Sequence, residues 1–172
     1  MPVTRLEITD LNADSFAEFG DVVQADGAFE TINVGTTRNF ADLASIDVTA
    51  EGGRVQVNIY RTTPVVMPFT IRMLERHPLS SQLFIPLERK PFLVVVAPPG
   101  ASVDPGKVRG FVTNGCQGVN YAPGTWHHPV LALDSESGFL VVDRAGPGKN
   151  CDDFFFDPSV QPVIKPDVSW SE

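Results

Sequence analysis

Short apolar runs alternate with turns rich in proline and glycine through most of the chain. The runs have the length of strands and carry many β-branched and aromatic side chains. Turn segments such as APPGASVDPG and AGPGKN separate them. This pattern predicts a mainly β protein, built as a barrel or a sandwich. The clearest runs are RVQVNIY (54–60), PFLVVVA (91–97), VRGFVT (108–113) and GFLVVD (138–143).

One segment near the start predicts a short helix. In NADSFAEFG (12–20), Asn12 and Asp14 are capping residues, and Phe16 and Phe19 are three positions apart, on one helix face. Gly20 is the expected stop signal. We therefore expect one short N-terminal helix before the strands begin.

The 172 residues are enough for one domain with a substantial core. The 15 prolines and 14 glycines are spread along the chain and mark no linker. We therefore predict a single domain over 1–172, with a proline-rich tail that is extended from about residue 158 and packs over the surface.

A net charge of -8 argues against nucleic-acid or anionic-membrane partners, because both need a basic patch. The longest apolar run, FLVVVA, is far too short to span a bilayer, and the first residues do not resemble a signal peptide. We expect a cytoplasmic protein. Cys116 and Cys151 are too far apart in the chain for a Cys-x-x-Cys motif and are expected to be reduced thiols.

Candidate chemistry lies in LERHPLSSQLFIP (74–86) and YAPGTWHHP (121–129). Glu75 and His77 share one face of a strand but not of a helix, and a turn could bring Gln82 back toward them. His127 and His128 would point to opposite faces of a strand, so only one of them can enter a small site.

The spacing of Glu75, His77 and Gln82 resembles the first cupin motif, His-x-His-x4-Glu, with two of the usual ligands replaced. APGTWH resembles the second motif and places His127 at the ligand position, with His128 outward. The resemblance implies a cupin-like double-stranded β-helix, or jelly-roll barrel. Two imidazoles, a carboxylate and an amide oxygen suit a borderline divalent ion such as nickel, zinc, manganese or iron.

Each residue also has a reading without a metal. His77 and His127 could be hydrogen-bonded pocket histidines, and Glu75 could pair with Arg72 or Arg76. The amide of Gln82 could bind substrate or backbone, because amides are poor metal ligands. For His128 a structural role is the expectation.

Several longer blocks, in order and with suitable gaps, resemble the ureidoglycolate lyase family. The match runs from about Ile32 to Asp153, and FAEFGDVV near the start also fits. It implies a homodimeric enzyme of allantoin breakdown that splits ureidoglycolate into glyoxylate and urea. The blocks are INVGTTRNFADLA, PFTIRMLERHPLSSQLFIP, FVTNGCQGVNYAPGTWHHP and FLVVDRAGPGKNCDD.

This reaction needs a base, an acid and a group that binds the substrate carboxylate, but no nucleophile. In one hypothesis a divalent ion, nickel or zinc first, is held by Glu75, His77, Gln82 and His127 and binds the substrate's carboxylate and hydroxyl oxygens. In the other hypothesis, without a metal, His77 or His127 is the base and Glu75 orients it.

Three arginines are candidates for the carboxylate clamp, because a guanidinium matches a carboxylate in a bidentate manner. Arg61 is the first choice. Arg72 and Arg76 bracket the Glu75 and His77 pair, although a regular strand would place them on the face with Leu74. Candidates for the urea end, which offers both donors and acceptors, are Asn33, Asn114 and Tyr121.

Two other classes remain open, because cupins host many chemistries. A metal-dependent cupin enzyme of another kind, such as an isomerase or dioxygenase, would also carry such a ligand set. A non-catalytic cupin would bind a small molecule without turnover.

Overall fold

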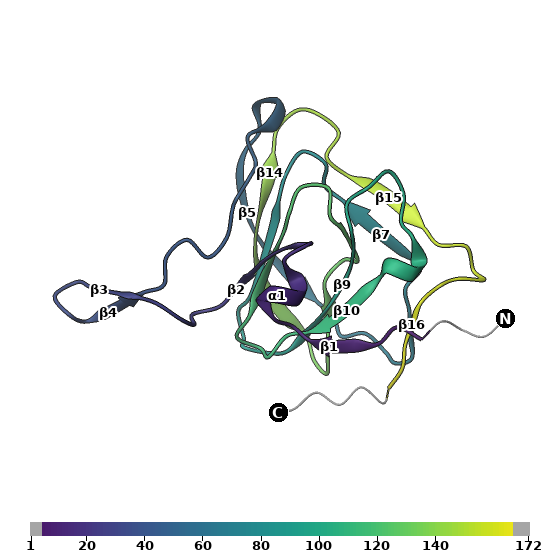
Figure 1. Ribbon diagram of the computed structural model, residues 1–172, viewed down its shortest axis with the longest axis horizontal. Helices are drawn as coiled ribbons and strands as arrows, with labels where there is room; N and C mark the ends of the chain where they lie inside the picture. The colour runs from purple at the N-terminus through teal and green to yellow at the C-terminus, as the bar shows by residue number, and fades with distance from the viewer. Residues whose placement is uncertain (1–4, 167–172) are drawn as a thin grey trace.

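The computed structural model describes residues 5–166, and its main elements are two facing β-sheets (Figure 1). Of the strand pairs described in these sheets, only β1 with β10 is parallel. The larger sheet has the order β1 (Ile8–Asp10), β10 (Arg109–Val112), β9 (Phe92–Ala97), β12 (Trp126–His127), β7 (Met73–Arg76) and β15 (Asp152–Phe155), with β13 (Leu131–Ala132) also on β9. The smaller has the order β2 (Gly20–Val23), β11 (Gly118–Tyr121), β8 (Gln82–Pro86), β14 (Ser137–Ala145) and β5 (Arg54–Thr62). This confirms the mainly β, cupin-like jelly-roll prediction.

Inward-facing side chains of both sheets fill the space between them and form the barrel core. Phe92 of the larger sheet and Phe139 of the smaller meet edge to face, with ring centroids 5.0 Å apart. The buried members of this core are Leu11, Phe16, Phe19, Phe84, Phe92, Val94, Val96, Phe111, Val119, Tyr121, Phe139 and Val141.

The opposite face of the larger sheet is also buried. There Leu93 and Val95 pack in a second apolar cluster together with residues near both chain ends, including Leu6 and Ile164. The strand β9 therefore contributes to both clusters, which explains why its sequence is an unbroken apolar run instead of an alternating one.

The predicted N-terminal helix forms but is shorter than expected. Helix α1 (Ala13–Phe16) is capped by Asn12, whose side-chain oxygen accepts a hydrogen bond from the Ser15 amide at 2.9 Å. It ends before Gly20, which has a φ of 146° and opens β2 instead of stopping the helix. A Cβ at Gly20 would collide with the Asn120 carbonyl, so close strand pairing requires glycine here.

A hairpin of β3 (Glu30–Ile32) and β4 (Thr37–Asn39) projects away from the barrel (Figure 1). At its tip Asn33 and Val34 adopt left-handed backbone angles, and the Val34 side chain is fully exposed. The remaining short elements are the 3-10 turns Ala50–Gly52 and Pro105–Lys107 and the strand pair β6 (Phe69–Thr70) with β16 (Val163–Ile164).

The predicted extended tail forms β16, but it does more than cover the surface, because Ile164 is fully buried. Residues 1–4 and 167–172 lie outside the described part, so the single domain over 1–172 stays a prediction. Among residues 5–166 there is no helix with the length and apolar character needed to cross a membrane.

The long edge strand β5 has an inverted polarity. Its apolar side chains Val55, Val57 and Ile59 are 52%, 62% and 58% exposed, on the outer face of the smaller sheet. Its polar residues Gln56 and Asn58 alternate with them and therefore point to the inside of the barrel. The inner wall at this point is thus polar.

Candidate active site at one end of the barrel

Polar side chains from six strands and one loop form a ring at one end of the barrel core. Strand pairing aligns them, because His127 is opposite Glu75 and Tyr121 is opposite Gln82. Within β14, Asp143 follows the core residues Phe139 and Val141 at alternate positions, so all three face inward. We call this set the polar ring; its members are Asn58, Glu75, His77, Gln82, Tyr121, His127 and Asp143.

Four of its side chains converge on one point. The Glu75 Oε1 atom lies 3.6 Å from His127 Nε2 and 3.9 Å from His77 Nε2, and Gln82 Oε1 lies 3.2 Å from His127 Nε2. One ligand atom each from Glu75, His77 and His127 lie within 4.8 Å of one another. The structure therefore brings together all four residues predicted as metal ligands.

Backbone carbonyls orient both imidazoles. His77 Nδ1 donates to the Asn150 carbonyl at 2.7 Å, and His127 Nδ1 donates to the Thr125 carbonyl at 3.0 Å. Because a carbonyl only accepts, each Nδ1 carries a hydrogen, and in a neutral ring Nε2 then presents a lone pair to Glu75. The His77 Nε2 atom is buried and has no hydrogen-bond partner.

The atoms that converge here, on Glu75, His77, Gln82 and His127, are therefore hydrogen-bond acceptors. No positively charged group lies among these four side chains. Burial lowers the pKa of His127, which favours its neutral form. Burial acts to raise the pKa of Glu75, but the interactions with His127, His77 and His128 outweigh it and leave this pKa below its usual value. Acceptors of this kind fit a divalent cation, or a proton held on a histidine.

Tyr121 supports His127 from the side. The two rings are stacked, with centroids 4.1 Å apart and an angle of 9° between their planes. Burial raises the pKa of Tyr121 well above its usual range, so the phenol stays neutral. Tyr121, predicted to bind the urea end, is thus in the ring and fixes the plane of the imidazole.

On the opposite side of the ring, amides hold Asp143. The Asn58 side chain donates to Asp143 Oδ1 at 3.2 Å and accepts from Gln56 at 3.3 Å. The Gln82 side chain also donates to Asp143, so its amide oxygen is the end that faces His127. Burial raises the pKa of Asp143 despite these hydrogen bonds.

A cavity of about 370 Å³ opens at the ring. The Arg144 guanidinium in its wall donates to the Ala50 and Pro147 carbonyls and holds the adjacent loops, whereas the Lys149 ammonium contacts Asp152 at 2.7 Å. The cavity is lined by His77, Ser80, Gln82, Asp143, Arg144, Lys149, Asn150 and Cys151.

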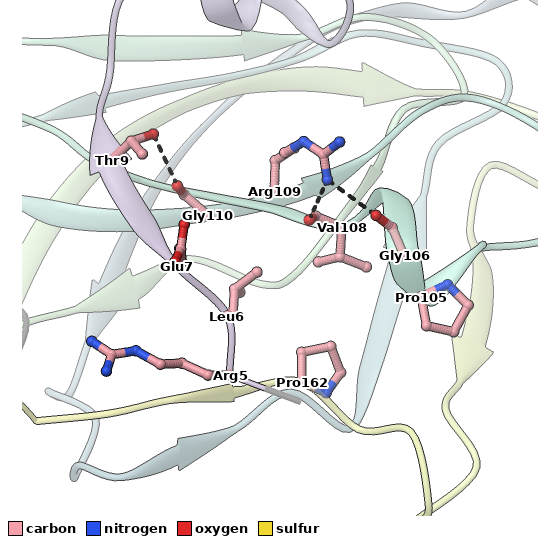
Figure 2. A pocket seen from close by; sticks show the side chains of 10 residues that line it. All are labelled: Arg5, Leu6, Glu7, Thr9, Pro105, Gly106, Val108, Arg109, Gly110 and Pro162. Atoms are coloured by element: carbon pink, nitrogen blue, oxygen red, sulfur yellow. Dashed lines mark hydrogen bonds between the residues drawn. The ribbon is translucent and has the colours of Figure 1, made fainter. Parts of the chain in front are cut away.

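A second cavity, of about 340 Å³, lies elsewhere, between the N-terminal strand and the Pro105–Lys107 turn (Figure 2). Its Arg109 side chain turns back to the Gly106 and Val108 carbonyls, at 3.2 and 3.0 Å (Figure 2). Prolines, aliphatic side chains and backbone make up much of the wall, and no histidine lines it. None of the predicted site residues lines this second cavity.

The two neighbouring histidines are separated as predicted. His127 is 1% exposed and lies in the ring. His128 points away, with its ring edge-on to Phe69 at 5.5 Å and its Nδ1 bonded to the Pro129 carbonyl.

The predicted arginine clamp does not form in this chain. Arg61 lies on the outer face of β5 with Val57 and Ile59, and its guanidinium contacts Glu88 at 2.6 Å. Arg76 lies on the outer face of the larger sheet, where it pairs with Asp152 at 3.0 Å and stacks over Trp126 at 4.7 Å.

Arg72 is exposed and precedes β7 on the same face as Leu74 and Arg76, because alternate residues of a strand share a face. None of the three arginines lines the cavity.

Two predicted urea-binding residues are also elsewhere. Asn33 is at the tip of the projecting hairpin, where it donates to Thr37 at 3.2 Å. Asn114 shapes a turn, since its side-chain oxygen accepts from the Cys116 amide at 2.9 Å. Both positions are explained by turn formation within this chain.

Sequence reasoning missed Asn58, Asp143, Ser80 and Asn150. Asn150 orients His77 through its carbonyl, and its side chain donates to Ser80 at 2.8 Å. The polar residues at alternate positions of RVQVNIY were a usable signal for Asn58. However, alternation alone does not say which face of a strand is inside.

The sequence model of the ureidoglycolate lyase family matches residues 3–163. A ureidoglycolate lyase of Burkholderia mallei (strain NCTC 10229) is 56% identical over 146 residues, 84% of this chain and 85% of that protein. One of Stutzerimonas stutzeri is 49% identical over 162 residues, 94% and 95% of the two chains. One of Azotobacter vinelandii is 50% identical over 160 residues, 92% and 96% of the two chains.

Among solved structures, RmlC from Streptococcus suis aligns with a TM-score of 0.47 and 11% identity, over 86% of this chain and 74% of that one. The family match extends over both cupin-like motifs and all the residues of the polar ring. The chain belongs to the ureidoglycolate lyase family.

Proposed function

We propose that this protein is a lyase that cleaves ureidoglycolate to glyoxylate and urea, as a step of allantoin breakdown. One observation carries the proposal: in a chain of the ureidoglycolate lyase family, Glu75, His77, Gln82 and His127 converge on one point, beside a polar cavity that His77 and Gln82 line. The reaction consumes no water and changes no oxidation state. The hydroxyl loses its proton, its oxygen forms the glyoxylate carbonyl as the C–N bond breaks, and the urea nitrogen gains a proton.

His77 is the proposed base. Its Nε2 lone pair has no hydrogen-bond partner, its side chain lines the cavity, and the Asn150 carbonyl fixes the tautomer. It takes the hydroxyl proton as the carbonyl forms and returns it to the departing nitrogen. Glu75, 3.9 Å away, stabilises the imidazolium between these two transfers. One residue thus acts as base and then as acid.

The residues also fit a divalent cation, nickel or zinc, held by Glu75, His77, Gln82 and His127. The fit rests on the buried, unpartnered His77 Nε2 and on the absence of a donor between His127 Nε2 and Gln82 Oε1. When bound, such an ion supplies positive charge that lowers the pKa of the substrate hydroxyl and holds its carboxylate.

The proposed setting is a cytoplasmic homodimer that acts on a small molecule, with no nucleic-acid or membrane partner. The outward apolar face of β5 supports dimerisation, because an exposed edge strand of this kind is usually covered by another chain.

The first experiment measures glyoxylate release from racemic ureidoglycolate by purified protein, before and after chelation and with single metal ions added back. A double variant, Glu75→Gln with His77→Ala, is the matched control and is expected to be inactive. Release that disappears on chelation and returns with one ion supports the lyase with a metal at the ring. Release that resists chelation supports the lyase with His77 as base, and no release under any condition contradicts the proposal.

A further inference from the structure

Asp143 is a carboxylate of the polar ring that the proposed reaction does not use. It faces the cavity from β14 of the smaller sheet, whereas Glu75 and His127 belong to the larger sheet. Its partners are the Asn58 side chain, at 3.2 Å, and the Gln82 side chain. Within residues 5–166, no lysine or arginine forms an ion pair with it.

The hydrogen-bonding capacity of Asp143 is only partly used. An ionised carboxylate offers about four acceptor sites, and the two amides occupy about two of them. These amides direct their N–H groups at Asp143, and Gln56 in turn donates to the Asn58 oxygen. The part of the wall at Asp143 therefore presents hydrogen-bond acceptors to the cavity. A ligand group that fits it is neutral and carries several N–H donors.

The substrate of the proposed reaction carries such a group at one end only. Its carboxylate would be repelled by Asp143, whereas its ureido group is neutral. The inner N–H and one terminal N–H of a ureido group point the same way, at a spacing that matches the two oxygens of a carboxylate.

We propose that Asp143 recognises the ureido end of the substrate by accepting N–H hydrogen bonds from it, with Asn58 and Gln82 holding the carboxylate in place. This rests on the proposed function. It makes Asp143 a specificity-determining residue, which selects a ureido compound over the same molecule with a methyl group in place of the terminal NH2. The substrate carboxylate then points away from Asp143, and Lys149 is a cation in the wall of the same cavity.

The test uses two stable ligands that cannot undergo the elimination because they lack the hydroxyl group. Ureidoacetate keeps the carboxylate and the ureido group, and N-acetylglycine has a methyl group in place of the terminal NH2. Calorimetry measures the affinity of each for the wild type and for Asp143→Asn. The wild type is expected to prefer ureidoacetate by about 10- to 100-fold, the range for one hydrogen bond to a charged group. Asp143→Asn is expected to lose most of this preference.

Asp21→Asn is the matched control. Asp21 lies on the outer face of the same sheet and also accepts from an asparagine, Asn120, at 2.9 Å. This variant is expected to keep the full preference. If Asp143→Asn does not fold, Asp143→Ser replaces it.

A preference that survives in the Asp143 variant, or is missing in the wild type, overturns the inference. The glyoxylate assay is run on the same preparations, so the two proposals can fail separately. A preference for ureidoacetate that depends on Asp143, without any glyoxylate release, would keep the ureido site and reject the lyase.

Discussion

His127 is the most constrained residue of the polar ring. Its Nδ1 bonds to a carbonyl, its face stacks on Tyr121, and its Nε2 lies near both Glu75 and Gln82. Each contact fixes a different degree of freedom, since they set the tautomer, the ring plane and the direction of the reactive nitrogen. His128, one residue later, has none of these contacts with the ring.

We therefore expect His127→Ala to abolish turnover, with a loss of roughly 100-fold or more, the range for a positioned acid, base or metal ligand. His128→Ala is expected to leave at least partial activity, because it removes the packing against Phe69 and the hydrogen bond to the Pro129 carbonyl but no hydrogen bond within the polar ring. Steady-state glyoxylate release from the two variants, with circular dichroism to verify folding, checks this. An equal loss in both folded variants would contradict the assignment.

The sequence was sufficient for the residues that follow strand alternation and the two cupin-like motifs, namely Glu75, His77, Gln82 and His127. It was not sufficient for Arg61. The position of Arg61 in β5 places it with Val57 and Ile59, and only barrel closure decides that this face is outside. For the same reason the sequence does not identify Asn58 as a site residue. From the sequence alone, Asn58 resembles an ordinary surface residue of a half-buried strand.

At the scale of elements, β5 has an apolar outer face and one edge that no strand within residues 5–166 pairs with. Strand β14 covers its other edge with nine aligned residue pairs. A long strand with this exposure invites pairing with another chain unless the assembly covers it. The projecting β3–β4 hairpin adds exposed apolar surface, including Phe29 and Val34. The length of helix α1 was harder to predict than its presence. The helix ends at Phe16 because the chain must reach Gly20, where β2 begins.

We expect Val57→Lys to convert the proposed dimer into a monomer, because a charge on this face opposes its burial against a second copy. Light scattering coupled to size-exclusion chromatography measures the molar mass. Val66→Lys, in an 82% exposed position between β5 and β6, is the matched control and should remain dimeric. A dimer that persists in Val57→Lys would place the interface elsewhere.

At the scale of the molecule, the barrel core supports the ring from below. Phe139 is fully buried and contacts both Phe92 and Phe84 edge to face, so it links the two sheets. The sequence predicted this core well, since apolar runs of strand length identify buried strands wherever the chain places them.

Phe139→Ala is expected to lower the free energy of unfolding by about 3–5 kcal/mol, the range for a large buried aromatic replaced by alanine. Urea denaturation followed by tryptophan fluorescence measures it. Tyr60→Ala is the comparison, because Tyr60 is 37% exposed at the margin of the same aromatic cluster. A loss in Phe139→Ala no larger than in Tyr60→Ala would contradict the linking role of Phe139.

The packed aromatic floor under the ring also bears on how a reaction there must end. Buried aromatic side chains pack the barrel below the ring, so we expect two products formed in the cavity to leave through the opening by which their precursor entered. Release is then sequential, and the product that lies nearer the floor waits for the other. We therefore expect the product that leaves last to inhibit the enzyme when it accumulates. The rate of the reaction then depends on how fast a later step consumes that product.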